Sequence, residues 1–208
     1  MPVLTLTLDK DESVYAQSGS MVMLAENIVM DTQLIGGLIG GMRRVAGGEP
    51  MYVTQYTSTK DGSRISFSDE AIGAMIPFEV SDVALMCDRS SFLCCETTVD
   101  FQIAFMKRIR DALFSGEGVV LQKLTGTGRA FLHSWGEVDV ISLADGEKIR
   151  VSSGKIVAFD ETVSLITRMM KGAKNIVFGK EGLFITELTG PGKVYIQSID
   201  RKEFRELR

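Results

Sequence analysis

The fold is decided by Glu181-Gly182-Leu183-Phe184-Ile185-Thr186-Glu187-Leu188-Thr189-Gly190-Pro191-Gly192, a stretch with two relatives earlier in the chain. When Glu181 is aligned with Glu49 and Glu117, an apolar residue follows four positions later and a threonine eight positions later in every copy. These positions are Val53, Leu121 and Ile185, then Thr57, Thr125 and Thr189. Glycine-containing turns come next, at 57–62, 125–128 and 189–192. Glycine and proline supply the torsions of tight turns, so each copy predicts a β-hairpin.

The flanking segments repeat as well. The return strands at 64–67, 129–132 and 193–196 match one another, and so do the turn-and-strand segments at 18–24, 89–95 and 153–159. Short strands separated by turn signals predict an all-β sandwich or barrel. We therefore expect three tandem β-repeats in one compact unit, covering 1–80, 81–146 and 147–208. Three similar units in one chain predict packing around a pseudo-threefold axis.

The third copy has no obvious last strand before the charged segment 200–208. The N-terminal segment Val3 to Leu8 alternates as a strand does, and it could close the ring of units at that place.

Composition restricts the function classes. The chain has 208 residues, 45% of them hydrophobic, and a formal net charge of −4, so it has no general attraction to nucleic acid or anionic lipid. Three cysteines, Cys87, Cys94 and Cys95, form no disulfide framework and favour a reducing compartment. The N-terminus lacks the pattern of a signal peptide, and no apolar run reaches the length of about 20 residues that a membrane span needs. We expect a soluble cytoplasmic protein.

The least ordinary segment runs from Gly36 to Glu49. It is not a phosphate loop, because Gly40-Gly41 is followed by Met42-Arg43 rather than by Gly-Lys-Ser/Thr. It is not a dinucleotide fingerprint either, because no continuous helix is predicted after it. The glycine spacing suits packed membrane helices, but the apolar part is too short to span a bilayer. A loop or short helix packed closely on a sheet is the simplest interpretation.

Each copy places an apolar-then-basic segment before its Glu-led strand, at about 36–48, 101–113 and 165–174. Pseudo-symmetry would bring the three basic clusters to one face. The candidate binding residues are Gly36, Gly37, Gly40, Gly41, Arg43, Arg44, Lys107, Arg108, Arg110, Lys171 and Lys174.

The glycine segment 36–49 and the segment 182–192 together resemble the signature of the altered-inheritance-of-mitochondria family, a family of uncharacterised bacterial, archaeal and fungal mitochondrial proteins. The resemblance covers nearly the whole chain. It implies the β-fold of the tryptophan RNA-binding attenuation protein (TRAP), repeated within one chain. It implies no established activity, so no catalytic residue carries over. Fungal mitochondrial members are linked to inner-membrane organisation. This sequence shows no transit peptide, so we do not expect that role to carry over directly.

Candidate chemical groups are few. The single histidine, His133, aligns with Ser68 and Gln197, which favours a polar strand residue over a catalyst. The cysteines lack zinc spacing and a histidine partner, so buried structural thiols are expected. The repeated glutamates Glu49, Glu117 and Glu181 could bind a cation near one axis, but strand-opening residues that accept backbone hydrogen bonds explain them more simply. No catalytic residue, metal ligand or cofactor is expected.

These patterns favour a non-catalytic scaffold or interaction protein that self-associates or binds a protein partner. The alternative is docking of the basic-apolar segments on an anionic membrane surface or on RNA. Net negative charge and the scarcity of aromatic residues near the basic ones argue against nucleic acid. An enzyme has the least support.

Overall fold

A computed structural model describes residues 1–34, 52–104, 121–169 and 184–200. These residues form an all-β structure of antiparallel sheets, with two short 3-10 turns, η2 (Arg89–Ser91) and η3 (Ser153–Lys155). The strands are β1 (Leu4–Leu8), β2 (Ser13–Gln17), β3 (Met21–Leu24), β4 (Ile28–Leu34), β5 (Tyr52–Ser58), β6 (Ser63–Phe67), β7 (Met75–Val80), β8 (Leu85–Asp88), β9 (Phe92–Glu96), β10 (Val99–Ala104), β11 (Leu121–Gly126), β12 (Gly128–His133), β13 (Val138–Leu143), β14 (Lys148–Ser152), β15 (Ile156–Asp160), β16 (Ser164–Met169), β17 (Phe184–Thr189) and β18 (Gly192–Gln197). The all-β prediction is confirmed.

The described strands form four sheets. Two have three strands, in the orders β1-β6-β3 and β14-β17-β16. Two have six strands, in the orders β4-β5-β2-β9-β12-β7 and β10-β11-β8-β15-β18-β13. Each six-strand sheet therefore consists of two groups of three strands, and the two groups come from successive parts of the chain.

Grouped by pairing, the strands give three units of six strands each: β1–β6, β7–β12 and β13–β18. In each unit the first, sixth and third strands form one group, and the second, fifth and fourth strands form the other. This grouping places β7 with the second unit and β13 with the third, because they pair with β12 and β18. It differs from the ranges 1–80, 81–146 and 147–208 that the sequence repeats suggested.

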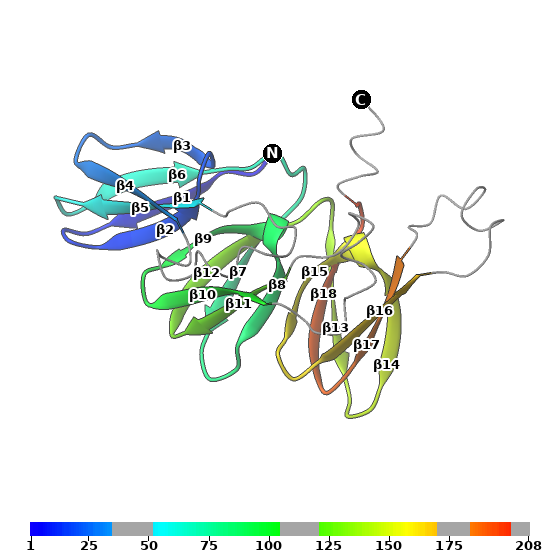
Figure 1. The fold of residues 1–208 in the computed structure, drawn as a ribbon. Coiled ribbons are helices and arrows are strands. Elements are labelled where there is room, and N and C mark those ends of the chain that lie inside the picture. Colours follow the sequence, from blue (N-terminus) through cyan, green and yellow to red (C-terminus); the bar gives the residue numbers. More distant parts are fainter. Residues whose placement is uncertain (35–51, 105–120, 170–183, 201–208) are drawn as a thin grey trace.

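Neighbouring units are joined by shared sheets. β2 of the first unit pairs with β9 of the second, and β8 of the second unit pairs with β15 of the third. Figure 1 shows the result as a row, with the first unit in blue and cyan at one end, the second in green, and the third in yellow and red at the other end. The first and third units share no sheet among the described strands.

Two expectations about topology are wrong. The Glu-led strand and the return strand of each copy do not form a hairpin, because β5 pairs with β2 and β4 while β6 pairs with β1 and β3. The glycine turns instead carry the chain from one sheet to the other. Gly126 and Gly128 have φ values of 96° and 154°, which suit a sharp corner as well as a hairpin. The N-terminal strand β1 does not complete the third unit either, since it pairs with β6 in the first.

The core follows the same organisation. One buried cluster contains Val53 of the first unit, Leu124 of the second and Val157 of the third, so apolar packing runs continuously through the joints between units. Burial of apolar side chains across these joints stabilises the array. Cys87, Cys94 and Cys95 are free and buried, as expected for structural thiols.

Candidate functional site

The sequence-predicted binding residues from Gly36 to Lys174 all lie outside the described residues, and so do Glu49, Glu117 and Glu181. The strands that flank these segments are described. Leu34 is opposite Tyr52, Ala104 is opposite Leu121, and Met169 is opposite Phe184. Residues 35–51, 105–120 and 170–183 therefore connect equivalent pairs of antiparallel strands, one pair in each unit. The apolar starts of the second and third apolar-basic segments, 101–104 and 165–169, belong to β10 and β16.

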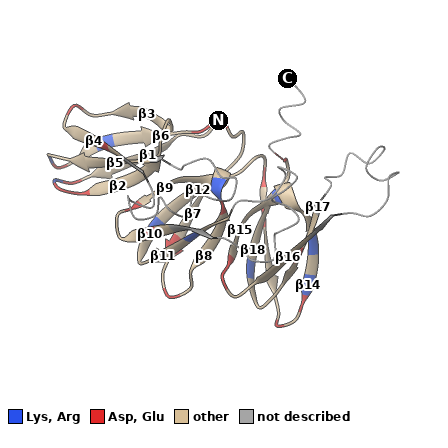
Figure 2. Ribbon diagram, viewed as in Figure 1, with Lys and Arg blue, Asp and Glu red and all other residues tan. Residues whose placement is uncertain are grey.

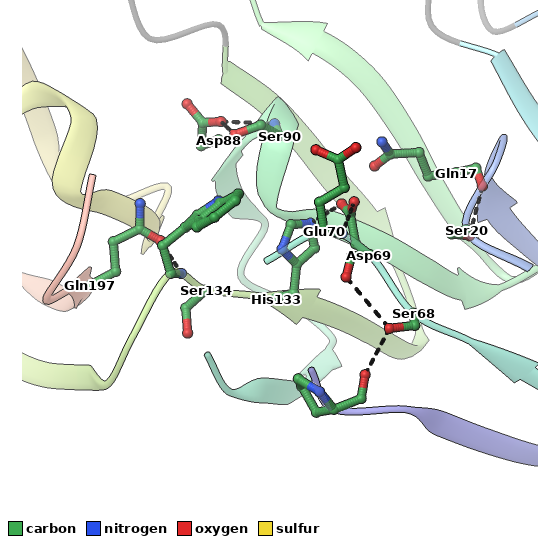
Figure 3. Close-up of polar contacts among 12 residues, drawn as sticks. Gln17, Ser20, Ser68, Asp69, Glu70, Asp88, Ser90, His133, Ser134 and Gln197 are labelled. Carbon is green, nitrogen blue, oxygen red and sulfur yellow. Dashed lines mark hydrogen bonds and ion pairs between the residues drawn. The ribbon is translucent and has the colours of Figure 1, made fainter. Parts of the chain in front are cut away.

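The described residues contain a polar cluster centred on His133 (Figure 3). His133 ends β12 and is buried, and its Nε2 lies 2.7 Å from Oδ2 of Asp69. Asp69 belongs to the segment between β6 and β7 and accepts a hydrogen bond from the backbone N–H of Glu70 at 2.5 Å. The histidine thus ties the second unit to the segment that leaves the first.

The residues that align with His133 make corresponding ties. Ser68 donates from Oγ to the carbonyl of Pro2 at 2.9 Å. Gln197 donates from Nε2 to the carbonyl of Gly154 at 3.0 Å and accepts a hydrogen bond from the backbone N–H of Trp135 at 2.9 Å. All three positions lie at the end of the return strand of their unit. Ser68 and Gln197 bind backbone groups, whereas His133 contacts the Asp69 side chain. The prediction that His133 occupies a polar structural position agrees with this geometry.

A histidine beside a carboxylate is also part of many catalytic sites, because the carboxylate orients the ring for proton transfer to a nucleophile. The adjacent Ser134 hydroxyl donates to the carbonyl of Gly136 at 3.0 Å and accepts from the backbone N–H of Ala74 at 3.1 Å. Burial raises the pKa of the Cys94 and Cys95 thiols far above the ordinary value, which removes the reactive thiolate. Within the described ranges, no group of three or more His, Cys, Asp or Glu residues could hold a metal ion.

A second feature is the edge strand β3, which differs from its counterparts in the other units. Val22 aligns with Leu93 of β9 and Val157 of β15, because all three stand at a bulge in the pairing with the return strand. Leu93 and Val157 have exposed fractions of 0%, whereas Val22 is 56% exposed. Met23, the next residue, is 41% exposed, while its counterparts Cys94 and Ala158 are fully buried. The first unit therefore presents two apolar side chains that the other units bury.

The edge strand β14 of the third unit also differs from its counterparts in the other units. By their pairing with β5, β11 and β17, Val14, Leu85 and Ile149 are equivalent. Val14 and Leu85 are buried, whereas Ile149 is half-buried. β14 also carries two exposed cations, which Figure 2 shows in blue, whereas β3 is tan along its length.

Those cations are held by one carboxylate. Oε1 of Glu187 lies 3.5 Å from Nζ of Lys148, and its Oε2 lies 3.3 Å from Nε of Arg150. The hydrogen bond from Arg150, followed by the charge of Lys148, lowers the pKa of Glu187. The pair of edges was not predicted from the sequence. The consecutive apolar residues Met21 to Leu24 align with the buried strands 92–95 and 156–159, and this alignment gives no sign that β3 is an edge.

The antiparallel sheets, two of which are shared between neighbouring units, define this chain as an all-β protein. A family model described as Mitochondrial biogenesis AIM24 matches residues 1–199, so the chain belongs to that family. This confirms the family expected from the glycine motifs.

Two streptococcal proteins are similar to this chain over most of its length. An uncharacterized protein of Streptococcus pyogenes serotype M6 is 28% identical over 211 residues, which cover 98% of this chain and 84% of that protein. The X-ray crystal structure of another Streptococcus pyogenes protein superposes with a TM-score of 0.80 at 23% identity, covering 99% of this chain and 92% of that one. The second comparison shows the fold alone. Among the described residues, no helix has the length and hydropathy needed to span a membrane.

Proposed function

We propose that this protein is a non-catalytic scaffold that binds protein partners by adding strands at the open edges of its sheets. The observation that carries the proposal is the exposure of Val22 and Met23 on β3, at positions that are buried in both equivalent strands. An edge strand offers unpaired backbone N–H and C=O groups, and strand addition is a common mode of protein recognition. Apolar side chains on such an edge favour a protein partner over solvent.

The proposal includes a TRAP-like repeat as the building unit. Its support is the strand order, which is the same in all three units, and the six-strand sheet that each pair of neighbouring units shares. A pseudo-threefold ring within one chain would need a sheet between the first and third units, and the described strands provide none. An open row is therefore the arrangement on which the proposal rests. The three free buried cysteines suit a reducing compartment such as the cytoplasm.

Site-specific photo-crosslinking in living cells tests this function. A photoreactive amino acid at Val22 should give a discrete crosslinked protein, whether that protein is another copy of the chain or a different one. The same group at Val140, a 50%-exposed residue of the edge strand β13, is the matched control, since β13 and its counterparts β1 and β7 are edges in all three units. Crosslinks of equal yield at both positions, or none at Val22, would contradict an interaction edge at β3.

A second function is favoured by the placement of the three apolar-basic segments on equivalent strand pairs. These segments are proposed to dock on an anionic membrane surface, because cations beside apolar residues suit the interface of a bilayer. Flotation with anionic and neutral vesicles tests it. Replacing Arg43 and Arg44 with alanine should abolish binding to anionic vesicles. Lys10 and Lys60 are exposed, and replacing both with alanine removes the same amount of charge. This control should preserve binding to anionic vesicles. Salt-sensitive binding to RNA in place of vesicles would contradict membrane docking.

A further inference from the structure

We propose that β14 of one copy pairs with β3 of a second copy, which would make a third version of the joint that already links the units within the chain. This inference rests on the proposed function, because it names the partner that occupies the open edges. The new sheet would have the order β16-β17-β14 from one copy followed by β3-β6-β1 from the other. That order reproduces both six-strand sheets within the chain.

The edge strands of the sheets are of two kinds. β1, β7 and β13 are edge strands at the same place in their units, and so are β4, β10 and β16. Among the described strands, each of these pairs on one side only in every unit, so none needs a further partner to complete the pattern. β3 and β14 are different, because their counterparts β9 and β15, and β2 and β8, are all paired across a joint. Among the described strands, the repeating pattern is thus interrupted only at the two ends of the row.

The strand register of the two joints within the chain can be applied to the free edges. In the first joint Val14 is opposite Glu96 and Ala16 is opposite Cys94. In the second joint their equivalents Leu85 and Cys87 are opposite Asp160 and Ala158. The two joints therefore share one antiparallel register. Applied to the free edges, it places Ile149 opposite Ala25 of the second copy, Arg150 opposite Leu24, and Val151 opposite Met23.

Pairing of β14 with β3 would bury apolar surface on both strands. Leu93 and Cys94 of β9 belong to the same buried cluster as Val14 and Ala16 of the preceding unit. Val157 and Ala158 of β15 likewise pack with Leu85 and Cys87. Val22 and Met23 of the second copy would contact Ile149 and Val151, which are only half-buried where they flank the core of the third unit. Complementary apolar surfaces are thus available on both sides.

The charged residues at the two free edges are complementary. The backbone N–H of Glu161 donates to the carbonyl of Ala84 at 2.9 Å, which extends the second joint by one position. The equivalent residues at the free edges are Glu26 and Lys148, both exposed and of opposite charge. Oppositely charged residues that face each other across antiparallel strands are stabilising. The Lys123–Glu161 ion pair already spans the second joint, so a charged contact beside this pairing has a precedent.

The joint uses different surfaces on its two sides, so it is heterologous. One copy that binds a second through β14 still has its own β3 free, and association does not stop at a dimer. A heterologous contact gives a closed ring when the rotation per copy closes, and an open filament when it does not.

Two measurements on the full-length purified protein test the joint. Sedimentation velocity over a range of concentrations should show species larger than a dimer, and Val22→Lys should weaken association by at least about tenfold, because a charge would be placed in the apolar centre of the contact. Val140→Lys, an equal change on β13, should leave association unchanged. Circular dichroism should show that both variants are folded.

The second measurement identifies the strands. Ala25→Cys and Ile149→Cys are prepared separately, one with ¹⁵N labelling, and are oxidised alone and mixed. The mixture should give a disulfide-linked dimer that contains one copy of each variant, and either variant alone should give none. A monomer at all concentrations would overturn the proposal, and so would a dimer linked through Ala25→Cys on both copies. A monomeric protein whose Val22 still crosslinks to a different protein in cells would overturn the copy-to-copy joint while leaving the scaffold function standing.

Discussion

Val22 and Val157 stand at the same bulged position of equivalent strands, yet Val22 is 56% exposed and Val157 is completely buried. The difference arises from the neighbour rather than from the residue. β15 has β8 beside it, whereas β3 is the last strand of its sheet among the described residues. The exposed fraction of the valine at this position therefore depends on whether a strand of a neighbouring unit pairs beside it.

This relationship predicts unequal effects of one substitution. Val157→Lys should lower the free energy of unfolding by about 3 kcal/mol or more, because an unpaired charge would be buried. Val22→Lys should change it by less than about 0.5 kcal/mol in dilute protein, since surface substitutions seldom do more. Urea unfolding of the two variants and the wild type checks both values. Equal losses would mean that β3 is covered within the single chain.

The three cysteines should be unreactive in the folded protein. Burial raises the pKa of each thiol, so at pH 8 the thiolate that attacks a disulfide reagent is almost absent in the native state. Ellman's reagent should label none of them in native protein and all three after denaturation in urea. Rapid native labelling of one thiol would show that the core around Cys87, Cys94 and Cys95 opens readily.

The Glu187 contacts predict a pH dependence. Because the folded state lowers the pKa of Glu187, the contribution of this carboxylate to stability is complete above the ordinary value of 4.5 and is lost as the pH falls through the lowered value. Wild type should be more stable than Glu187→Gln at pH 6, and the difference should shrink between pH 6 and pH 3. The urea midpoints of both proteins at the two pH values measure it. A difference that persists undiminished at pH 3 would assign the effect to packing instead of charge.

The segment between the first two units depends on a close backbone contact. A Cβ on Gly73 would lie 2.1 Å from the carbonyl oxygen of Ser134, beside the bridge between Gly73 and Gly136. Gly73→Ala should therefore cost about 1–3 kcal/mol of stability through overpacking. Gly146→Ala meets no atom within 4 Å, and any cost there would come from its φ of 74° alone. Thermal unfolding of the two variants compares them. A smaller loss for Gly73→Ala would contradict a rigid connection.

The sequence predicted the all-β class, the family and the buried cysteines, because repeated apolar positions and glycine turns report local structure and burial directly. It predicted the wrong partner for the return strands, since the torsions of Gly126 and Gly128 suit a hairpin and a corner between sheets equally well. It also placed the N-terminal strand in the wrong unit. Pairing between strands that are distant in sequence depends on tertiary contacts, and no local pattern around Val3 to Leu8 specifies β6 as the neighbour.

The polar cluster and the open edges were harder to foresee. The alignment of His133 with Ser68 and Gln197 indicated a polar structural position, but Asp69, its partner, has no sequence pattern that marks it. For β3, the sequence shows an apolar strand like those at 92–95 and 156–159, and exposure becomes visible only when the neighbouring strands are placed.

The His133–Asp69 contact predicts energetic coupling. Asp69→Ala should lower stability by about 1–3 kcal/mol, because the buried ring would lose the carboxylate that lies beside its Nε2. In a double-mutant cycle with His133→Gln, the second substitution should remove most of the cost of the first. Additive losses would show that the two side chains stabilise the junction independently.

Hydrogen–deuterium exchange shows whether the β3 and β14 edges pair between copies. Peptides that cover 21–24 and 148–152 should exchange more slowly in concentrated wild type than in Val22→Lys at the same concentration, because pairing protects the edge amides. Peptides from β4 and β13 should exchange at the same rate in both proteins. Equal exchange of β3 and β14 in the two proteins would contradict the account.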